Sequence, residues 1–274
     1  MRKLKTYAAA FFLGLSMAVF SAIGISAIDV TVYTDGLKYE GEVRLVNKNA
    51  YVSLREFACT VDNSVVAWDK ETDTATVTTE SLVLTATKGA DYMVANGRYL
   101  WCSEGIFTDD GVIYVPLQRV AQAFGFNNRW SFTDNTNYLT RKAGAIEAAD
   151  TYYDEDDVYW LSRIINAEAQ GEPFKGKLAV GSVIMNRMED EEFPDELYDV
   201  IFDNDSGVQF TPTVNGAIEK EPNEDSVIAA KLCLDGFRIS NTILYFLNPD
   251  LASNFWVSQN CTFVMRIGQH DFYA

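Results

Sequence analysis

The sequence predicts two α+β domains in tandem, the first β-rich and built from a repeat, the second mainly helical. Three observations support this division. Short alternating runs of β-branched and aromatic residues fill positions 29–141, and one pattern recurs there after 63 residues. From residue 154 onward, apolar residues recur at helical spacing. The 274 residues also exceed the size of one average domain.

Residues 1–27 have the composition of a secretory signal peptide. Three basic residues within the first five precede an apolar run from Ala8 to Phe20, and cleavage is expected after Ser26-Ala27. The alternative is an uncleaved membrane tether, since the 23 residues from Thr6 to Ile28 carry no charge and suffice to span a bilayer. In both cases the remainder is expected to work outside the cytoplasm.

The composition excludes several classes of function. A formal net charge of −17 disfavours nucleic acid as a partner, because phosphate backbones would repel the protein. The sequence has one histidine, His270, whereas a zinc amidase or zinc peptidase normally needs at least two imidazoles. The cysteines show no CxxC spacing. We therefore expect neither a metal site nor a cofactor.

The four cysteines fall two in each half of the chain. If the protein is exported and each half folds alone, the pairs are Cys59 with Cys102 and Cys233 with Cys261. The alternative is four free, buried thiols. The sequence leaves both states open.

The internal repeat lies in the first domain, which we expect over residues 28–142. One copy runs from Tyr51 to Trp68 and the other from Tyr114 to Trp130. Each copy has the pattern of a strand, a short helix and a strand carrying the tryptophan, and two such units can stack on one core. Other alternating runs predict strands at 30–33, 74–78, 82–86 and 112–115.

The repeated YVxLRxxA…W pattern, with Val94-Ala95-Asn96-Gly97 between its copies, resembles the copper-amine-oxidase N-terminal-like domain. In the second copy the arginine is shifted by one position, to Arg119. The resemblance implies a spacer or wall-associating stalk. No copper site is expected, because this half has no histidine. The aromatic residues Tyr92, Tyr99 and Trp101 either stack on sugars or pack in a core, and core packing is the favoured interpretation.

Residues 143–153 are rich in alanine and acidic residues and are expected to be a linker. The second domain, residues 154–274, should open with a helix capped by Asp154. A second helix is predicted from Phe174 to Met188, and a third from Pro222 to a residue before Gly236.

The C-terminal part of this domain should be β-structure. Two strands, residues 242–247 and 262–267, are predicted to pair through a loop that carries Trp256. His270 follows in a strand-like run, and we expect it to be a hydrogen-bonded packing residue rather than a base.

The informative position of the first helix is Glu168. Leu161, Ile164 and Ile165 share one helix face with it, at i, i+3, i+4 and i+7. A carboxylate on an apolar face either forms a salt bridge, here to Arg163 or Arg187, or has a raised pKa and stays neutral. A neutral carboxylic acid is the proton donor that cleavage of a glycosidic bond requires.

Distinctive motifs surround Glu168 in a fixed order. They are Ile164-Ile165-Asn166-Ala167-Glu168-Ala169-Gln170-Gly171-Glu172-Pro173-Phe174, Leu178–Arg187, Phe193-Pro194, Val200–Phe202, Gln209–Thr211, Tyr245–Pro249, Trp256 and Ile267–Phe272. The series resembles the SleB-type cell-wall hydrolases, the spore-cortex-lytic enzyme family, over residues 158–273. The resemblance implies a lysozyme-like α+β domain with a small sheet, and it implies that Glu168 is the catalytic acid.

The count of carboxylates bears on the mechanism. Glu172 is the only second carboxylate within the motif, and Gly171 and Pro173 suggest that it points away from the helix face. With Glu168 alone, the C6 hydroxyl of muramic acid becomes the attacking group, which is lytic transglycosylation rather than hydrolysis. The family resemblance implies the same outcome. The candidates for substrate binding are Gln209, Phe210, Tyr245, Asn248 and Trp256.

The sequence therefore predicts a secreted enzyme that cleaves peptidoglycan between N-acetylmuramic acid and N-acetylglucosamine, in the cell wall or the spore cortex. Two alternatives stay open. One is an N-acetylmuramoyl-L-alanine amidase. The other is a non-catalytic cell-wall-binding protein, for which the stalk and an altered cleft would suffice.

Overall fold

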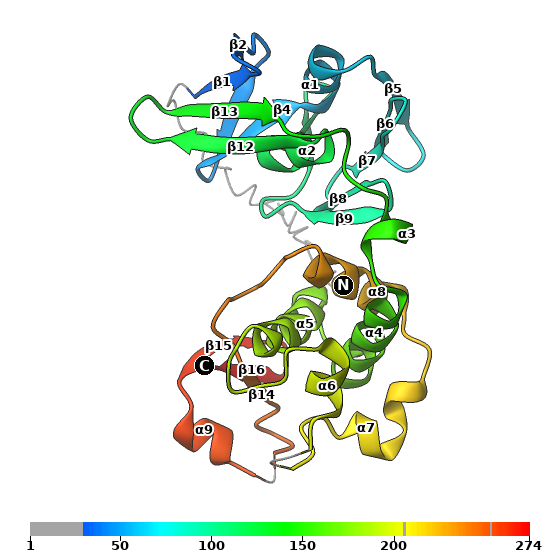
Figure 1. Cartoon of the computed structure of the whole chain (residues 1–274), viewed down its shortest axis with the longest axis vertical. Helices are drawn as coiled ribbons and strands as arrows, with labels where there is room; N and C mark the ends of the chain where they lie inside the picture. The colour runs from blue at the N-terminus through cyan, green and yellow to red at the C-terminus, as the bar shows by residue number, and fades with distance from the viewer. Residues whose placement is uncertain (1–29, 205–206, 253) are drawn as a thin grey trace, which may run out of the picture.

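The structure, a computed structural model, describes residues 30–204, 207–252 and 254–274. The predicted signal peptide lies outside these residues. Within them, no helix combines the length and apolar character needed to cross a membrane. Figure 1 shows a β-rich N-terminal domain stacked on a mainly helical C-terminal domain, as the sequence predicts.

The repeat forms the centre of the N-terminal domain. Strands β4 and β11, which open the two copies, pair antiparallel with Val52 opposite Val115, and each leads directly into a helix. Phe57 from the first helix meets Phe124, which follows the second, with ring centroids 6.0 Å apart. The predicted shared core is therefore present. The elements are β3 (Val43–Val46), β4 (Asn49–Ser53), α1 (Leu54–Val61), β10 (Phe107–Asp109), β11 (Val112–Pro116) and α2 (Leu117–Ala123), with sheet order β10-β11-β4-β3.

Two further sheets complete this domain. In one, with order β12-β13-β1-β2, the strand after the second helix returns as a long hairpin that pairs with the first strand of the chain. The other is a five-stranded meander in sequence order. The strands are β1 (Thr31–Thr34), β2 (Leu37–Lys38), β5 (Val65–Asp69), β6 (Thr74–Thr78), β7 (Val83–Thr87), β8 (Tyr92–Ala95), β9 (Arg98–Trp101), β12 (Phe126–Ser131) and β13 (Thr136–Arg141).

The three main helices of the C-terminal domain follow from their capping residues. Asp154 caps α4 (Glu155–Ala169), accepting a hydrogen bond from the Asp156 backbone at 2.8 Å. Helix α5 (Phe174–Met188) has the predicted range. Helix α8 (Glu224–Leu234) begins two residues later than predicted, because the Asn223 side chain caps it instead of Pro222 starting it. The shorter helices are α6 (Leu197–Phe202), α7 (Pro212–Asn215), η1 (Ala217–Glu219) and α9 (Trp256–Asn260).

The end of α8 is a Schellman motif. Gly236 takes the left-handed conformation with φ +85°, as the predicted C-terminal position requires. The backbone N–H of Gly236 donates to the Cys233 carbonyl, and that of Phe237 donates to the Leu232 carbonyl, both at 3.0 Å.

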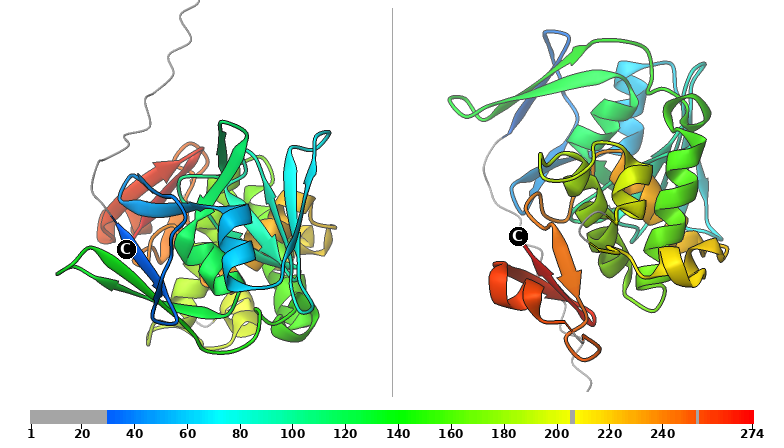
Figure 2. Two further views of the ribbon diagram at one scale, coloured as in Figure 1. Left: turned by 90° about the horizontal axis from the view of Figure 1, so that it is seen from above. Right: turned by 60° about the horizontal axis from the view of Figure 1, so that its bottom comes forward.

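The predicted pairing of residues 242–247 with 262–267 is wrong. Both segments pair instead with a third strand, in the order β14-β16-β15. A tight turn at Gly268, with φ +58°, folds this strand back at once, so a local hairpin forms in preference to a long-loop pairing. Trp256 opens α9 rather than lying in a loop. Figure 2, right, shows β14 (Tyr245–Leu247), β15 (Phe263–Ile267) and β16 (His270–Tyr273) beside the helices.

All four cysteines are free, so neither of the two disulfides considered is present; the alternative of four free, buried thiols holds for the free state, but only two of the thiols are buried. Cys102 and Cys233 are buried in the cores of their domains. Cys59, by contrast, is exposed, and Cys261 is half-buried. Each buried thiol therefore lies in surroundings different from those of its expected partner.

The aromatic residues of β8 and β9 pack between the domains. Tyr92 and Trp101 each lie with their ring centroid 6.5 Å from that of Phe174, and Trp101 lies 4.6 Å from Phe237. Tyr99 packs against Tyr92 with the rings tilted by 57° and their centroids 5.3 Å apart. The favoured interpretation, packing rather than sugar stacking, holds, but the core that these rings join belongs to the C-terminal domain.

A buried ion pair fixes the same interface. Arg98 donates from Nε to Asp235 Oδ1 at 2.9 Å, and the two side chains are 8% and 2% exposed. The Tyr153 hydroxyl also donates to Asp235, and the Tyr152 ring lies 3.2 Å from the guanidinium carbon. Tyr152 ends the short helix α3 (Ala149–Tyr152), so the segment expected to be a linker takes part in the contact between the domains.

Asp235→Ala should destabilise the protein by about 3–5 kcal/mol, because it leaves Arg98 buried without its counter-ion. Urea unfolding followed by circular dichroism measures the change. The matched control is Glu189→Ala, which removes the partner of Arg238 where the carboxylate is 71% exposed. This control should cost less than about 1 kcal/mol. Equal losses in the two variants would contradict a stabilising role for the buried pair.

Candidate active site

Glu168 occupies the last turn of α4, on the face that Leu161, Ile164 and Ile165 bury in the core. The helix ends one residue later, at Ala169, and the chain turns away. The glutamate side chain therefore continues an apolar stripe at the point where the helix leaves the core. This local geometry agrees with the periodicity of the sequence.

Glu168 has no counter-ion among the described residues. Arg163, one candidate partner, binds Glu221 at 2.7 Å instead. Arg187, the other, donates to the Leu244 carbonyl at 2.8 Å and to Gln209 Oε1 at 3.2 Å. The salt-bridge alternative for Glu168 is therefore not realised.

Burial without a partner raises the pKa of Glu168 to about 7. The negative end of the α4 dipole lies at this helix terminus and acts in the same direction. A carboxyl group with such a pKa exchanges its proton readily at neutral pH, which suits a group that must first donate a proton and then accept one.

The carboxyl group opens into a cleft of about 800 Å³. Four predicted binding residues, Gln209, Phe210, Tyr245 and Asn248, line the cleft together with Glu168. The fifth, Trp256, is not in the lining; its ring packs edge-on against Tyr245 at 6.1 Å and is 53% exposed. Residues separated by up to 80 positions in the sequence thus meet in one site.

Arg187 organises one wall of the cleft, a role that the motif alone does not reveal. Its bonds to Leu244 and Gln209 join α5 to the residue before β14 and to the loop before α7. Its guanidinium carbon also lies 5.3 Å from the ring centres of both Phe210 and Tyr245. The structure shows this arginine to be 5% exposed, and in the sequence it follows the apolar run Val183-Ile184-Met185 after one asparagine.

Glu172 lies in the lining of the same cleft, although the sequence suggests that it points away. Its Oε2 accepts a hydrogen bond from the Gln269 backbone at 3.0 Å. A Cβ at Gly268 would come within 1.7 Å of the same oxygen, so the β15–β16 turn closes directly on this carboxylate. Glu172 therefore anchors the hairpin.

His270 is a packing residue, as predicted. The predicted hydrogen bond is not seen at its Nδ1, which has no partner among the described residues. The ring is 8% exposed and lies edge-on to Phe246, with centroids 5.3 Å apart. Burial lowers the pKa of His270, so the neutral imidazole is favoured. It faces the cleft from the sheet side.

Comparison with known protein families identifies both halves of the chain. Residues 171–273 match the Cell Wall Hydrolase family, and residues 33–139 match the Copper amine oxidase N-terminal domain. Both resemblances inferred from the motifs are thereby confirmed. The first match begins three residues after Glu168, so the catalytic role of that glutamate stays a prediction.

Individual relatives align with the C-terminal half. The spore cortex-lytic enzyme of Bacillus subtilis is 33% identical over 140 residues, which cover 51% of this chain and 45% of the relative. That of Oceanobacillus iheyensis is 34% identical over 120 residues, covering 44% and 42%. The chain thus spans about half the length of the curated relatives it matches.

One solved structure that aligns is the catalytic domain of the germination-specific lytic transglycosylase SleB from Bacillus anthracis. It is 32% identical and covers 44% of this chain and 97% of its own, with a TM-score of 0.41. The catalytic domain of the Bacillus cereus SleB protein is also 32% identical, with coverages of 44% and 92% and a TM-score of 0.40.

The raised pKa predicts a pH-dependent stability. Between about pH 4.5 and pH 7 the folded protein keeps a proton on Glu168 that the unfolded chain releases, so stability falls as pH rises through this window. Glu168→Gln removes the effect. The variant should match the wild type at pH 4 and exceed it by on the order of 2–3 kcal/mol at pH 8.

Urea unfolding at the two pH values measures this difference. The matched control is Glu191→Gln, which removes the same charge at an exposed position and should show no such gain at pH 8. A Glu168→Gln variant that is no more stable than the wild type at pH 8 would show that the carboxylate is well solvated or paired.

Proposed function

We propose that this chain, whose C-terminal half is a cell wall hydrolase domain and whose N-terminal half is a copper amine oxidase N-terminal-like domain, cleaves the glycan strand of peptidoglycan. One observation carries the proposal: Glu168 is a half-buried carboxyl group without a counter-ion among the described residues, and it opens into a cleft of about 800 Å³. Homology to spore cortex-lytic enzymes supports peptidoglycan as the substrate.

The proposed reaction needs one acid. Protonated Glu168 donates its proton to the oxygen that joins N-acetylmuramic acid C1 to N-acetylglucosamine, and the C1–O bond breaks. The muramic acid C6 hydroxyl then attacks C1 while the Glu168 carboxylate takes its proton. The products are a 1,6-anhydromuramic end and a free hydroxyl on the departing sugar, and the glutamate regains its starting state.

Glu172 supports this transglycosylation in preference to hydrolysis. Hydrolysis needs a second carboxylate as nucleophile or as a base for water. One Glu172 oxygen already accepts the Gln269 N–H at 3.0 Å and is covered by Gly268. A carboxylate that holds a hairpin turn in this way is poorly placed to move onto a sugar carbon.

The cleft walls supply groups that suit the substrate. Tyr245 and the adjoining Trp256 present aromatic faces for sugar rings, whereas the amides of Gln209 and Asn248 match acetamido groups. Phe210 also lines the cleft, but its side chain is only 2% exposed. We further propose that this helical domain with its three-stranded sheet is lysozyme-like.

The same proposal places the protein outside the cytoplasm, secreted to the cell wall or the spore cortex. The signal-peptide composition and the named activity of the relatives support this location. The stalk would then keep the cleft at a fixed orientation, because the Arg98–Asp235 pair joins the two domains.

Incubation with purified peptidoglycan, followed by mass spectrometry of the released fragments, tests the reaction. We expect muropeptides with 1,6-anhydromuramic ends. Glu168→Gln should lower the release rate by ~10²–10⁴, since it removes acid–base assistance. Glu172→Gln, the matched control, should release the same products at a measurable rate.

Each other outcome contradicts part of the proposal. Reducing muramic acid ends would indicate hydrolysis, and free stem peptides would indicate an amidase. No release by the wild type would indicate a wall-binding protein without activity. Full activity of Glu168→Gln would exclude this residue as the acid.

A further inference from the structure

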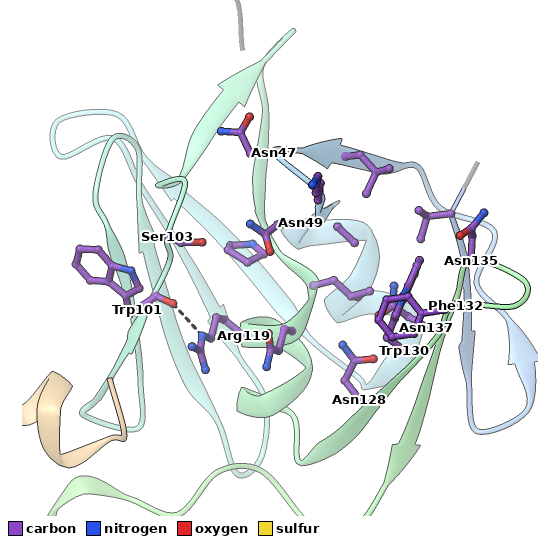
Figure 3. Close-up of a pocket in the computed structure, with 17 residues that line it drawn as sticks. Asn47, Asn49, Trp101, Ser103, Arg119, Asn128, Trp130, Phe132, Asn135 and Asn137 are labelled. Atoms are coloured by element: carbon purple, nitrogen blue, oxygen red, sulfur yellow. Dashed lines mark hydrogen bonds between the residues drawn. The ribbon is translucent and has the colours of Figure 1, made fainter. Parts of the chain in front are cut away.

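The N-terminal domain contains a second concavity, a trough of about 710 Å³ that shares no lining residue with the cleft. Figure 3 shows its labelled side chains in a row, with Trp101 at one end, Asn49 and Arg119 between, and Trp130 and Phe132 at the other. The trough lies over the start of α2, the β3–β4 turn and the β12–β13 hairpin. Nothing in the proposed reaction uses it.

The charge of the trough differs from that of the whole chain. The formal net charge is −17, yet none of the 17 lining residues is acidic. Lys48 and Arg119 are the charged residues in the lining, and neither forms a salt bridge within the described ranges. Arg119 donates instead to the Trp101 carbonyl and to Gln122. The lining therefore contains no carboxylate that would repel a negatively charged ligand, and its two basic residues would attract one.

Amide side chains are the commonest polar groups in its lining. Asn137, which is 5% exposed, lines the trough from β13. A side-chain amide carries both donors and an acceptor, so it can bond to the amide groups of a ligand. Four more asparagines line the trough: Asn47, Asn49, Asn128 and Asn135.

The hairpin end of the trough carries exposed aromatic rings. Trp130 and Phe132 pack edge-to-face with centroids 6.1 Å apart, and Phe132 is 89% exposed. A phenylalanine held in solvent beside a concave surface is a typical contact for an apolar ligand face. Trp68, the counterpart of Trp130 in the first repeat copy, lies outside the trough. Only the second copy therefore presents this arrangement in the described structure.

We propose that the trough is a second saccharide-binding site, for a strand of N-acetylated hexosamines with carboxylate substituents. Trp130 and Phe132 would stack on sugar rings, the asparagine amides would bind acetamido groups, and Lys48 and Arg119 would attract the carboxylates. The choice of this polymer rests on the proposed function. The trough would hold a wall strand while the cleft cuts it, which compensates for the repulsion between anionic polymer and acidic protein.

Tryptophan indole NMR signals of the full chain test this proposal site by site. The probe is the disaccharide-tetrapeptide of peptidoglycan, which lacks the bond between muramic acid and the next sugar. The Trp130 signal should shift on titration while that of Trp68 stays in place. Any shift of Trp256 reports the cleft separately, so failure at the trough is distinguishable from failure of the proposed function.

Two variants at exposed positions test the contacts without disturbing the core. Phe132→Ala and Asn128→Ala should each weaken the Trp130 titration by about tenfold, which corresponds to the loss of one good contact. The matched control, Trp68→Ala, should leave it unchanged. An unmoved Trp130 signal, an equal response to the free tetrapeptide, or unaltered titration in both variants would overturn the proposal.

Discussion

The site depends on one electrostatic constraint: the Glu168 carboxyl group lies at the buried end of a helix without a cation beside it among the described residues. Burial of an ionised carboxylate costs several kcal/mol, so the group holds its proton up to a pKa of about 7. Packing of α4 enforces this position, since Leu161, Ile164 and Ile165 fix the helix face. This position lowers the stability of the folded protein when the carboxyl group is ionised. The same position raises the pKa of the group, and the raised pKa makes it useful as an acid.

The other charged residues of the cleft serve its architecture. Arg187 joins α5 to the residue before β14 through the Leu244 carbonyl, and it donates a hydrogen bond to Gln209. Glu172 joins the turn between α4 and α5 to the turn between β15 and β16. Arg187 and Glu172 form their hydrogen bonds with residues of the cleft walls and not with Glu168. These bonds hold the walls in place and leave Glu168 without a charged partner among the described residues.

Local signals in the sequence predicted local structure well. The Asp154 cap and the apolar stripe defined α4, and the repeat predicted the paired β4 and β11. The strand pairing was predicted wrongly because a local hairpin with β15 places β16 between the two strands that were expected to pair. The contact between Trp101 and Phe237 joins the two domains, and no pattern within either domain predicts such a contact. Four of the five predicted binding residues line the cleft, because the motifs marked them independently of their spacing.

The stalk is firmly attached to the enzyme domain, since Arg98 and Asp235 form a buried pair across the interface. The trough and the cleft are therefore held at a fixed separation. A polymer can reach both at once, whereas a small substrate can occupy only one. The central claim, however, concerns the proton on Glu168. Carbon-13 NMR of the glutamate carboxyl groups, with the Glu168 signal assigned by Glu168→Gln, measures its titration directly. A midpoint near 7 is predicted, and a midpoint near the ordinary value of 4.5 would contradict the account.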